Sequence, residues 1–189
     1  MLPEMPQISL CDECGTFFWL DDLLDDAEIV DRSDPMFPWE DRNNTMFPIV
    51  RFLGTLEYLE AVEAGVCRTT DEELKLRLLA WRAHNDILLD RKPSRRGRPA
   101  PEQKNRLLTD SEWRQNLEAI LALTKRRRSP EHRLVRIEIY RELGDFEAAK
   151  AELSKMDTSG DWGPYVRCLR ELCEKRDSRV GRVQLDSMG

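Results

Sequence analysis

Residues Glu131–Met156 read EHRLVRIEIYRELGDFEAAKAELSKM and predict two helices joined by a tight turn. Apolar side chains recur every third or fourth residue in each half, and this spacing places them on one helix face. They are Leu134, Ile137, Tyr140 and Leu143 in the first half, and Phe146, Ala149, Leu153 and Met156 in the second. Gly144 suits the left-handed backbone conformation that ends many helices, because it has no Cβ. We therefore expect a helical hairpin that packs its apolar faces on neighbouring helices.

The same residues carry a resemblance to a known repeat. Tyr140, Leu143-Gly144-Asp145-Phe146, Ala148-Ala149 and Leu153 stand in the order of a repeat core. This pattern resembles the tetratricopeptide repeat (TPR), although Arg133 and Arg136-Ile137 replace the aromatic and Leu-Gly positions of the family. The resemblance implies a stack of at least three hairpins that binds peptides or proteins in a concave groove. No second clear copy occurs in the sequence, so a single antiparallel helix pair is the alternative.

The apolar spacing predicts further helices from Thr55 to about Lys175. Gly65 ends one of them, and Thr70 with Glu73 forms a capping box for the next. The residues expected on buried faces are Leu56, Leu59, Val62, Leu74, Leu78, Trp81, Trp113, Leu117, Ile120, Leu121, Val166, Leu169 and Cys173. The predicted fold is mainly α, an antiparallel helical-hairpin array of TPR-like form. A short β-knuckle and an extended arm precede it.

Three regions follow from changes in composition along the chain. Residues 1–48 form an acidic knuckle and extended arm, residues 49–177 a helical domain, and residues 178–189 a frayed tail. The helical domain contains a basic loop at 90–105, where Pro and Arg interrupt the helical spacing. Residues 1–41 carry 12 acidic and one basic side chain, a net charge of −11. Subtracting this from the total of −6 leaves +5 for the remainder, so the acidic segment is expected to lie against basic surface of its own or a second copy.

Composition and cysteine usage indicate the compartment. No segment approaches the roughly 18 consecutive apolar residues of a membrane span, so no membrane contact is expected. The first residues lack the basic start and apolar centre of a signal peptide. Five cysteines without a disulfide-like spacing favour the reducing cytoplasm.

The N-terminal region contains a Cys-x-x-Cys-Gly motif at Cys11, Cys14 and Gly15, flanked by two short apolar segments. Two thiolates at this spacing can converge on one zinc ion, and the glycine permits the turn between them. One such motif supplies two of the four ligands of a structural zinc site, so zinc is a candidate cofactor rather than an established one. A reduced structural turn and a redox pair are the alternatives. The start is similar to that of small bacterial proteins with Cys-x-x-Cys-Gly-x-x-Phe-Trp, for which no activity is assigned.

Aromatic residues accompany proline after this motif. The sequence Met-Phe-Pro occurs at residues 36–38 and again at 46–48, which is typical of an extended arm. The candidate partner-binding residues are Trp19, Phe37, Trp39 and Phe47. They are expected either to cover the core or to dock on a second subunit. The acidic residues from Asp21 to Asp31 lack the spacing of a calcium loop and are expected to form a solvated face.

Two basic runs, Arg91–Arg98 and Lys125–Arg128, raise the question of nucleic acid binding. The second run ends a predicted helix, where cations complement the helix dipole. Neither run is interleaved with aromatic residues for base stacking, and the total charge is negative, so nucleic acid is not the expected partner.

The sequence contains no evident set of catalytic residues. The chain lacks nucleophile-elbow, phosphate-loop and dinucleotide-binding motifs, and it has two histidines. His84 is expected near the core as a hydrogen-bonded neutral ring. We therefore expect no enzyme, but a helical scaffold that binds a protein partner or a second copy of itself. The alternative is a zinc-binding module that uses Cys11 and Cys14 and contacts nucleic acid through the basic loops.

Overall fold

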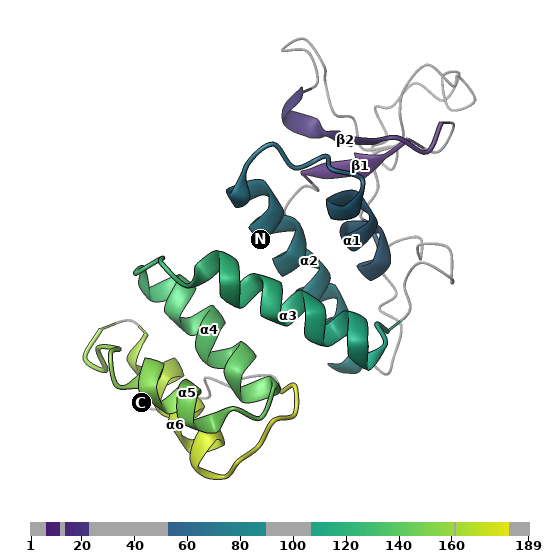
Figure 1. The fold of residues 1–189 in the computed structure, drawn as a ribbon. Coiled ribbons are helices and arrows are strands. Elements are labelled where there is room, and N and C mark those ends of the chain that lie inside the picture. Colours follow the sequence, from purple (N-terminus) through teal and green to yellow (C-terminus); the bar gives the residue numbers. More distant parts are fainter. Residues whose placement is uncertain (1–6, 12–13, 23–52, 90–106, 161, 182–189) are drawn as a thin grey trace, which may run out of the picture.

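Helices dominate the computed structural model, which describes residues 7–11, 14–22, 53–89, 107–160 and 162–181. Within these ranges the chain forms two strands, one short 3-10 helix and six α-helices (Figure 1). They are β1 (Ile8–Leu10), β2 (Phe17–Trp19), η1 (Leu20–Asp22), α1 (Thr55–Glu63), α2 (Thr70–Leu89), α3 (Asp110–Thr124), α4 (Pro130–Glu142), α5 (Phe146–Leu153) and α6 (Gly163–Glu174). The predicted mainly α class is confirmed. No helix in the described ranges has both the length and the apolar character needed to cross a membrane.

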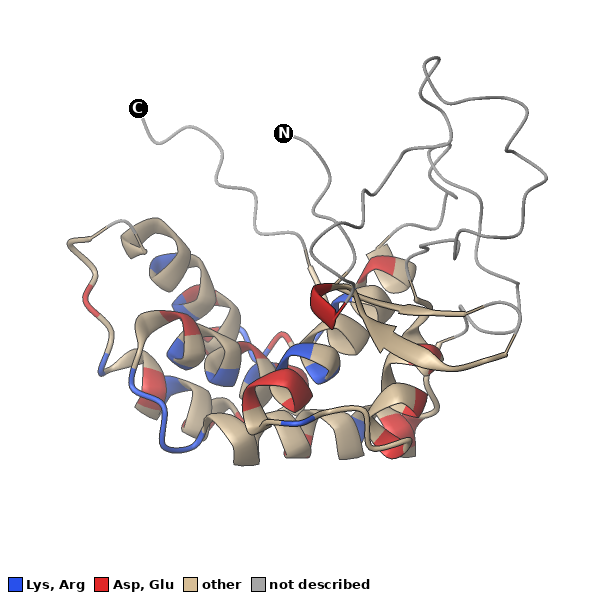
Figure 2. Ribbon diagram, turned by 90° about the horizontal axis from the view of Figure 1, so that it is seen from above, with Lys and Arg blue, Asp and Glu red and all other residues tan. Residues whose placement is uncertain are grey.

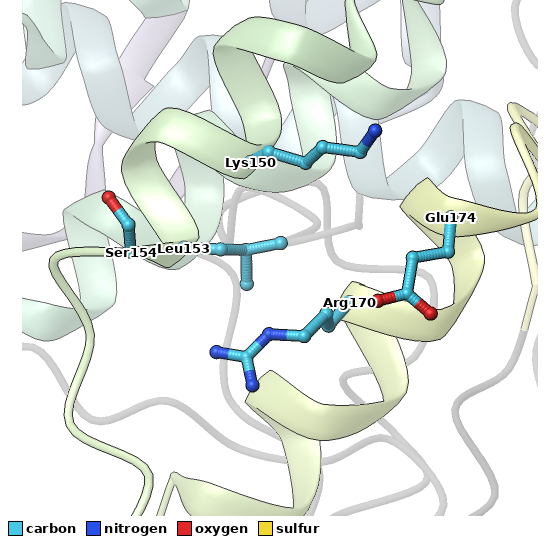
Figure 3. A pocket seen from close by; sticks show the side chains of 5 residues that line it. All are labelled: Lys150, Leu153, Ser154, Arg170 and Glu174. Carbon is cyan, nitrogen blue, oxygen red and sulfur yellow. The ribbon is translucent and has the colours of Figure 1, made fainter.

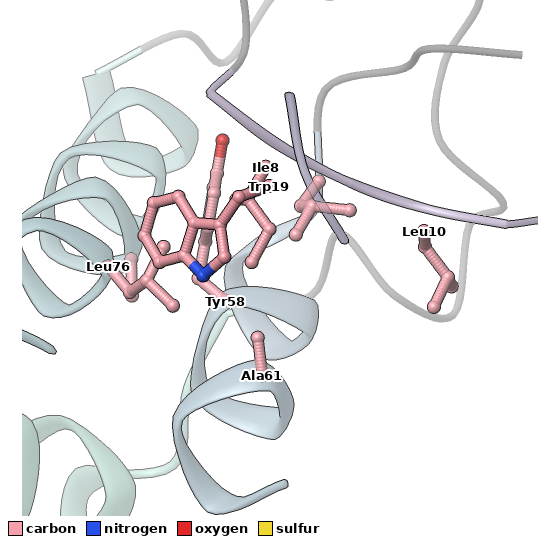
Figure 4. Close-up of a cluster of buried hydrophobic side chains, with 8 residues drawn as sticks. Ile8, Leu10, Trp19, Tyr58, Ala61 and Leu76 are labelled. Atoms are coloured by element: carbon pink, nitrogen blue, oxygen red, sulfur yellow. The ribbon is translucent and has the colours of Figure 1, made fainter. Parts of the chain in front are cut away.

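The two strands form an antiparallel hairpin in which Ile8 pairs with Trp19 and Leu10 with Phe17. Successive side chains along a strand point to opposite faces, and paired residues point to the same face, so Ile8, Leu10 and Trp19 share one face of the hairpin. That face packs on the first two helices, together with Leu53, Tyr58, Ala61, Leu76 and Ala80. Figure 4 shows the indole of Trp19 among Ile8, Tyr58 and Leu76. The hairpin therefore shares a core with the helices, whereas the predicted domain boundary at residue 48 lies outside the described residues.

Successive helices pack on one another in chain order, from α1 on α2 through to α5 on α6. The second core cluster joins α2, α3 and α4 through Leu74, Trp81, Leu117, Ile120 and Ile139. The third joins α4, α5 and α6 through Leu134, Ile137, Phe146, Ala149, Leu153, Val166, Leu169 and Cys173. Figure 1 shows this succession from the hairpin at the top to α6 at the bottom. Each helix thus buries its apolar face against its sequence neighbours.

The hairpin of α4 and α5 forms where the apolar spacing predicts it. Gly144 has φ +79°, the left-handed conformation expected of the turn. The side chain of Asp145 accepts a hydrogen bond from the backbone N–H of Ala148 at 3.1 Å and so caps α5. Helix α6 contacts both members of this pair, because Val166, Leu169 and Cys173 face them. Cys173 is a core residue, as predicted.

The starts of the first two helices differ from the sequence prediction. In α2 the capping residue is Thr69 rather than Thr70, since the N–H of Glu72 donates to Thr69 Oγ1 at 3.1 Å. In α1 the buried centre is Tyr58 and Ala61, whereas Leu56, Leu59 and Val62 are half-buried. Glu57 of α1 is also fully buried, and its carboxylate accepts a hydrogen bond from the Gly54 N–H at 2.8 Å. The buried face of α1 is thus shifted by one residue from the predicted face.

Residues 178–181 of the predicted tail are described, and the main chain there is bonded to Arg141 of α4. The guanidinium of Arg141 donates from Nη1 to the carbonyl oxygens of Asp177 and Arg179, both at 2.8 Å. These bonds hold the chain beyond α6 against α4. Residues 182–189 of the predicted tail lie outside the described residues, as do most of the predicted arm and the whole basic loop at 90–105.

Candidate functional site

The cysteine motif lies at the turn that joins β1 to β2. The N–H of Cys11 donates to the carbonyl of Thr16 at 2.9 Å, and the N–H of Gly15 donates to the carbonyl of Cys11 at 2.9 Å. Gly15 has φ +69°, which favours glycine at this position. Cys14 is exposed and Cys11 is half-buried. The turn therefore presents one thiol to solvent, with a second thiol three residues earlier in the chain.

The electrostatic environment favours a thiolate at Cys14. Its sulfur lies 3.3 Å from the hydroxyl oxygen of Thr16. Hydrogen bonds from the side chain and backbone of Thr16, and then from Cys11, lower the pKa of Cys14 below its ordinary value. Thiolate is the form that binds soft metal ions and attacks electrophiles. The motif therefore has the chemistry of a zinc ligand pair or of a reactive thiol.

The other cysteines and histidines lie elsewhere in the described chain. His84 is buried; its Nδ1 accepts a hydrogen bond from the N–H of Leu108 at 3.1 Å, and its ring stacks on Trp113 at 4.2 Å. Burial lowers the pKa of His84, so the predicted neutral core histidine is confirmed. His132 Nδ1 lies 2.6 Å from Ser129 Oγ. Across the described ranges, no group of three or more His, Cys, Asp or Glu side chains is arranged to hold a metal ion.

Of the predicted partner-binding aromatics, the structure describes Trp19. Its side chain is 5% exposed, and its Nε1 donates to the carbonyl of Val66 at 2.9 Å. Trp19 is therefore engaged within its own chain and offers almost no surface to a partner. Phe37, Trp39 and Phe47 lie outside the described residues.

A groove of about 240 Å³ runs between α5 and α6 (Figure 3). It is lined by Lys150, Leu153, Ser154, Arg170 and Glu174. Figure 3 shows the Leu153 side chain between Lys150 above it and Arg170 below it. The ammonium of Lys150 lies 3.2 Å from the Glu147 carboxylate, whereas Arg170 forms no ion pair with the described residues. The groove thus offers two cations, one carboxylate and a small apolar floor.

Charges of both signs are mixed over the helices, as Figure 2 shows. The predicted basic run at Lys125–Arg128 follows the end of α3, where Arg127 pairs with Asp71 of α2 and donates from Nε to the carbonyl of Leu123 at 3.3 Å. Arg68 pairs with Asp22 at 2.6 Å, which is one contact of the predicted kind between the acidic N-terminal segment and a basic side chain. The Arg91–Arg98 run lies outside the described residues.

A buried polar cluster between α2, α4 and α6 is absent from the sequence prediction. Arg141 pairs with Glu138 at 2.8 Å, and Tyr165 donates from its hydroxyl to Glu138 at 2.9 Å. Glu142 accepts hydrogen bonds from Trp81 Nε1 at 2.8 Å and from Asn85 Nδ2 at 3.2 Å. Its side chain is 4% exposed. The cluster therefore joins α2, α4 and α6.

No family model, curated protein or solved structure matches this chain. The function is therefore inferred from the chemistry of the described residues. The groove can bind charged groups, and the thiol pair can bind a soft metal ion. The buried cluster instead has a consequence for stability.

Glu142 is expected to make the protein less stable as the pH rises from about 4.5 to above 7. Burial, and then the charge of Glu138, raise the pKa of Glu142 to about 7 from its ordinary 4.5, although bonds from Trp81 and Asn85 and the charge of Arg141 lower it. Between these values the folded chain keeps a proton that the unfolded chain has released, so stability falls with rising pH. The full loss is on the order of 3 kcal/mol. Urea unfolding at several pH values should show that the free energy of unfolding of Glu142→Gln lacks this loss.

The difference between variant and parent isolates the effect of Glu142. The contribution of His84 to the pH dependence of stability has the opposite sign, because its lowered pKa makes stability rise with pH up to about 6.5. It contributes equally to the parent and to Glu142→Gln, and it cancels in the difference. Glu118→Gln, which changes an exposed carboxylate on α3, is the matched control and should leave the pH profile unchanged. Parallel profiles for the parent and Glu142→Gln would contradict the prediction.

Proposed function

We propose that this protein is a non-catalytic helical scaffold that binds an acidic segment of a protein partner in the groove between α5 and α6. The observation that carries the proposal is the open groove, in which Lys150 and Arg170 lie on either side of Leu153, a buried core residue that closes the bottom of the groove. Carboxylates of a peptide can pair with the two cations, and arginine can do so in a bidentate geometry.

The contacts of α6 favour the TPR-like array that we propose for α4, α5 and α6, and such an array would support a role in binding. In such arrays each unit contacts its neighbouring units. Helix α6 contacts α4 and α5 in this manner, and Gly144 and Asp145 form the turn between those two helices. The solvent-facing residues of α6, Arg167, Arg170, Glu171 and Glu174, are charged, which is typical of the polar outer face of a terminal unit. A charged outer face favours a polar, acidic segment over an apolar helix.

A peptide of residues 20–34 provides a defined acidic probe, with seven carboxylates and one arginine. We expect the labelled peptide to bind the full chain in fluorescence anisotropy, and added salt to weaken this binding. The double variant Lys150→Glu and Arg170→Glu should weaken binding by about tenfold or more, since it turns attraction into repulsion. Arg114→Glu reverses an exposed charge on α3 and is the matched control. Equal loss in both variants would contradict a groove-specific site, and no binding would contradict the proposal.

The same probe addresses self-association, because its sequence belongs to this chain. If the acidic segment of one copy binds the groove of another, light scattering in the presence of EDTA should show a mass above 22.2 kDa that falls to this value in the double variant. An unchanged mass together with peptide binding would assign the groove to a different protein.

Zinc binding at Cys11 and Cys14 is the second candidate function. The specific observation in its favour is the exposed and half-buried thiol pair on a hydrogen-bonded turn. All five cysteines are free, as expected of the reducing cytoplasm that we propose for this protein. The contacts to nucleic acid in this alternative depend largely on Arg91–Arg98, outside the described residues.

A further inference from the structure

The thiol pair lies on the β1–β2 hairpin, which packs on α1 and α2. Ile8 and Trp19, at the far end of the hairpin, are buried in the core with α1 and α2. The backbone bonds between Cys11, Gly15 and Thr16 hold the turn at its exposed end. Metal ligands are most effective when rigid elements position them before the ion arrives. The hairpin therefore presents the thiol of Cys14 at its exposed end, with the half-buried thiol of Cys11 three residues earlier in the chain.

One chain supplies too few ligands for a structural zinc site. Such sites bind zinc through four Cys or His side chains in a tetrahedral arrangement. The chain has five cysteines and two histidines, and the structure describes all seven of them. Cys173 and His84 are buried in other core regions, and Cys67 packs against the core cluster that joins the hairpin to α1 and α2. No third ligand joins Cys11 and Cys14 among the described residues.

We propose that two copies of the chain share one zinc ion, with Cys11 and Cys14 of each copy supplying its four thiolate ligands. This inference rests on the zinc-binding candidate above and is independent of the groove. Each thiol releases its proton to solvent when it binds, and no redox step is required. Exposure of Cys14 allows the two turns to approach each other.

The charge around the motif makes this association depend on the metal. Asp12 and Glu13 lie between the two cysteines in the sequence and carry negative charges. Two such motifs repel each other, and the thiolates add to the repulsion. A divalent cation between them offsets these charges. The dimer should therefore form with zinc and separate without it.

The test uses the full chain, purified with a phosphine reductant and without chelator. Elemental analysis should find one zinc ion per two chains, and light scattering should give twice the 22.2 kDa mass. Dialysis against EDTA of the Lys150→Glu and Arg170→Glu double variant, which excludes association through the groove, should return the mass to 22.2 kDa, and added ZnCl₂ should restore the dimer. Cobalt substituted for zinc should give the absorption spectrum of a tetrahedral tetrathiolate site.

Cysteine variants locate the site. Cys11→Ser and Cys14→Ser should each abolish the zinc-dependent dimer, while circular dichroism checks that they fold. Cys168→Ser changes a half-buried thiol on α6 and should retain the dimer. One zinc ion per 22.2 kDa monomer would keep zinc binding but overturn the shared site. No bound zinc would overturn both, and a dimer that survives EDTA would overturn the shared site. None of these outcomes changes the peptide-binding test of the groove.

Discussion

Arg141→Ala is expected to lower the free energy of unfolding by about 3–5 kcal/mol, because it breaks a buried ion pair from one side. The guanidinium is 2% exposed and lies 2.8 Å from the carboxylate of Glu138. It also donates to the carbonyl oxygens of Asp177 and Arg179 at 2.8 Å. Alanine would remove one donor from the half-buried carboxylate of Glu138, which keeps its bond from Tyr165, and would leave two carbonyl oxygens without their donor. Urea unfolding monitored by circular dichroism measures the loss.

Two further variants separate charge from geometry at this position. Arg141→Lys keeps the positive charge, but a single ammonium cannot reproduce the planar set of donors, so an intermediate loss is expected. Arg114→Ala removes an exposed arginine from α3 and should change the stability by less than about 0.5 kcal/mol. The buried role of Arg141 would be contradicted if its alanine variant were no less stable than this control.

The local part of the fold could be predicted from the sequence. Helices α4 and α5 are specified by apolar residues at helical spacing, together with Gly144 at a turn that requires positive φ. The capping residues Thr109 and Ser129 likewise stand next to the helices that they start. These signals act within a few residues of chain, so the sequence alone contains them. The β-hairpin around the Cys-x-x-Cys turn is local in the same sense.

The buried arginines could not be predicted in this way. Arg136 and Arg141 lie on α4 among charged residues, and their local pattern is that of a solvated face. Arg136 instead donates to the carbonyl oxygens of Thr124 at 2.8 Å and Arg127 at 3.0 Å, and it pairs with Glu152 at 2.7 Å. These partners come from the end of α3 and from α5. The burial of a charge therefore depends on tertiary contacts that the sequence of one helix does not contain.

Of the two candidate sites, one could be predicted from the sequence and the other could not. The spacing of Cys11 and Cys14 in the sequence predicts them as a pair, because the chemistry of that motif depends on neighbouring residues alone. The groove was not predicted, since Lys150 and Arg170 lie 20 positions apart and look like ordinary surface cations until α5 and α6 pack. The role of Trp19 also depends on packing. A mutation can distinguish a residue that covers the core from one that binds a partner.

Trp19→Ala is expected to destabilise the isolated protein by about 3–5 kcal/mol, as is typical when a large core aromatic is removed. The indole is 5% exposed and packs with Ile8, Tyr58 and Leu76, so alanine would leave a cavity between the hairpin and the helices. Its Nε1 also donates to the carbonyl of Val66 at 2.9 Å. A residue whose role is to contact a partner would show no such loss in the free protein. Urea unfolding of the purified monomer distinguishes the two roles.

Two other variants define how Trp19 acts. Trp19→Phe keeps an aromatic ring but leaves the carbonyl of Val66 without its donor, so a loss of about 1–3 kcal/mol is expected. Trp162→Ala makes the same chemical change at a tryptophan that is 42% exposed and forms no side-chain cap at the start of α6. It should cost less than about 0.5 kcal/mol. Equal effects at Trp19 and Trp162 would mean that the hairpin does not depend on its tryptophan for docking. The hairpin carries Cys11 and Cys14, so that result would also weaken the case for a rigid, preformed thiol pair.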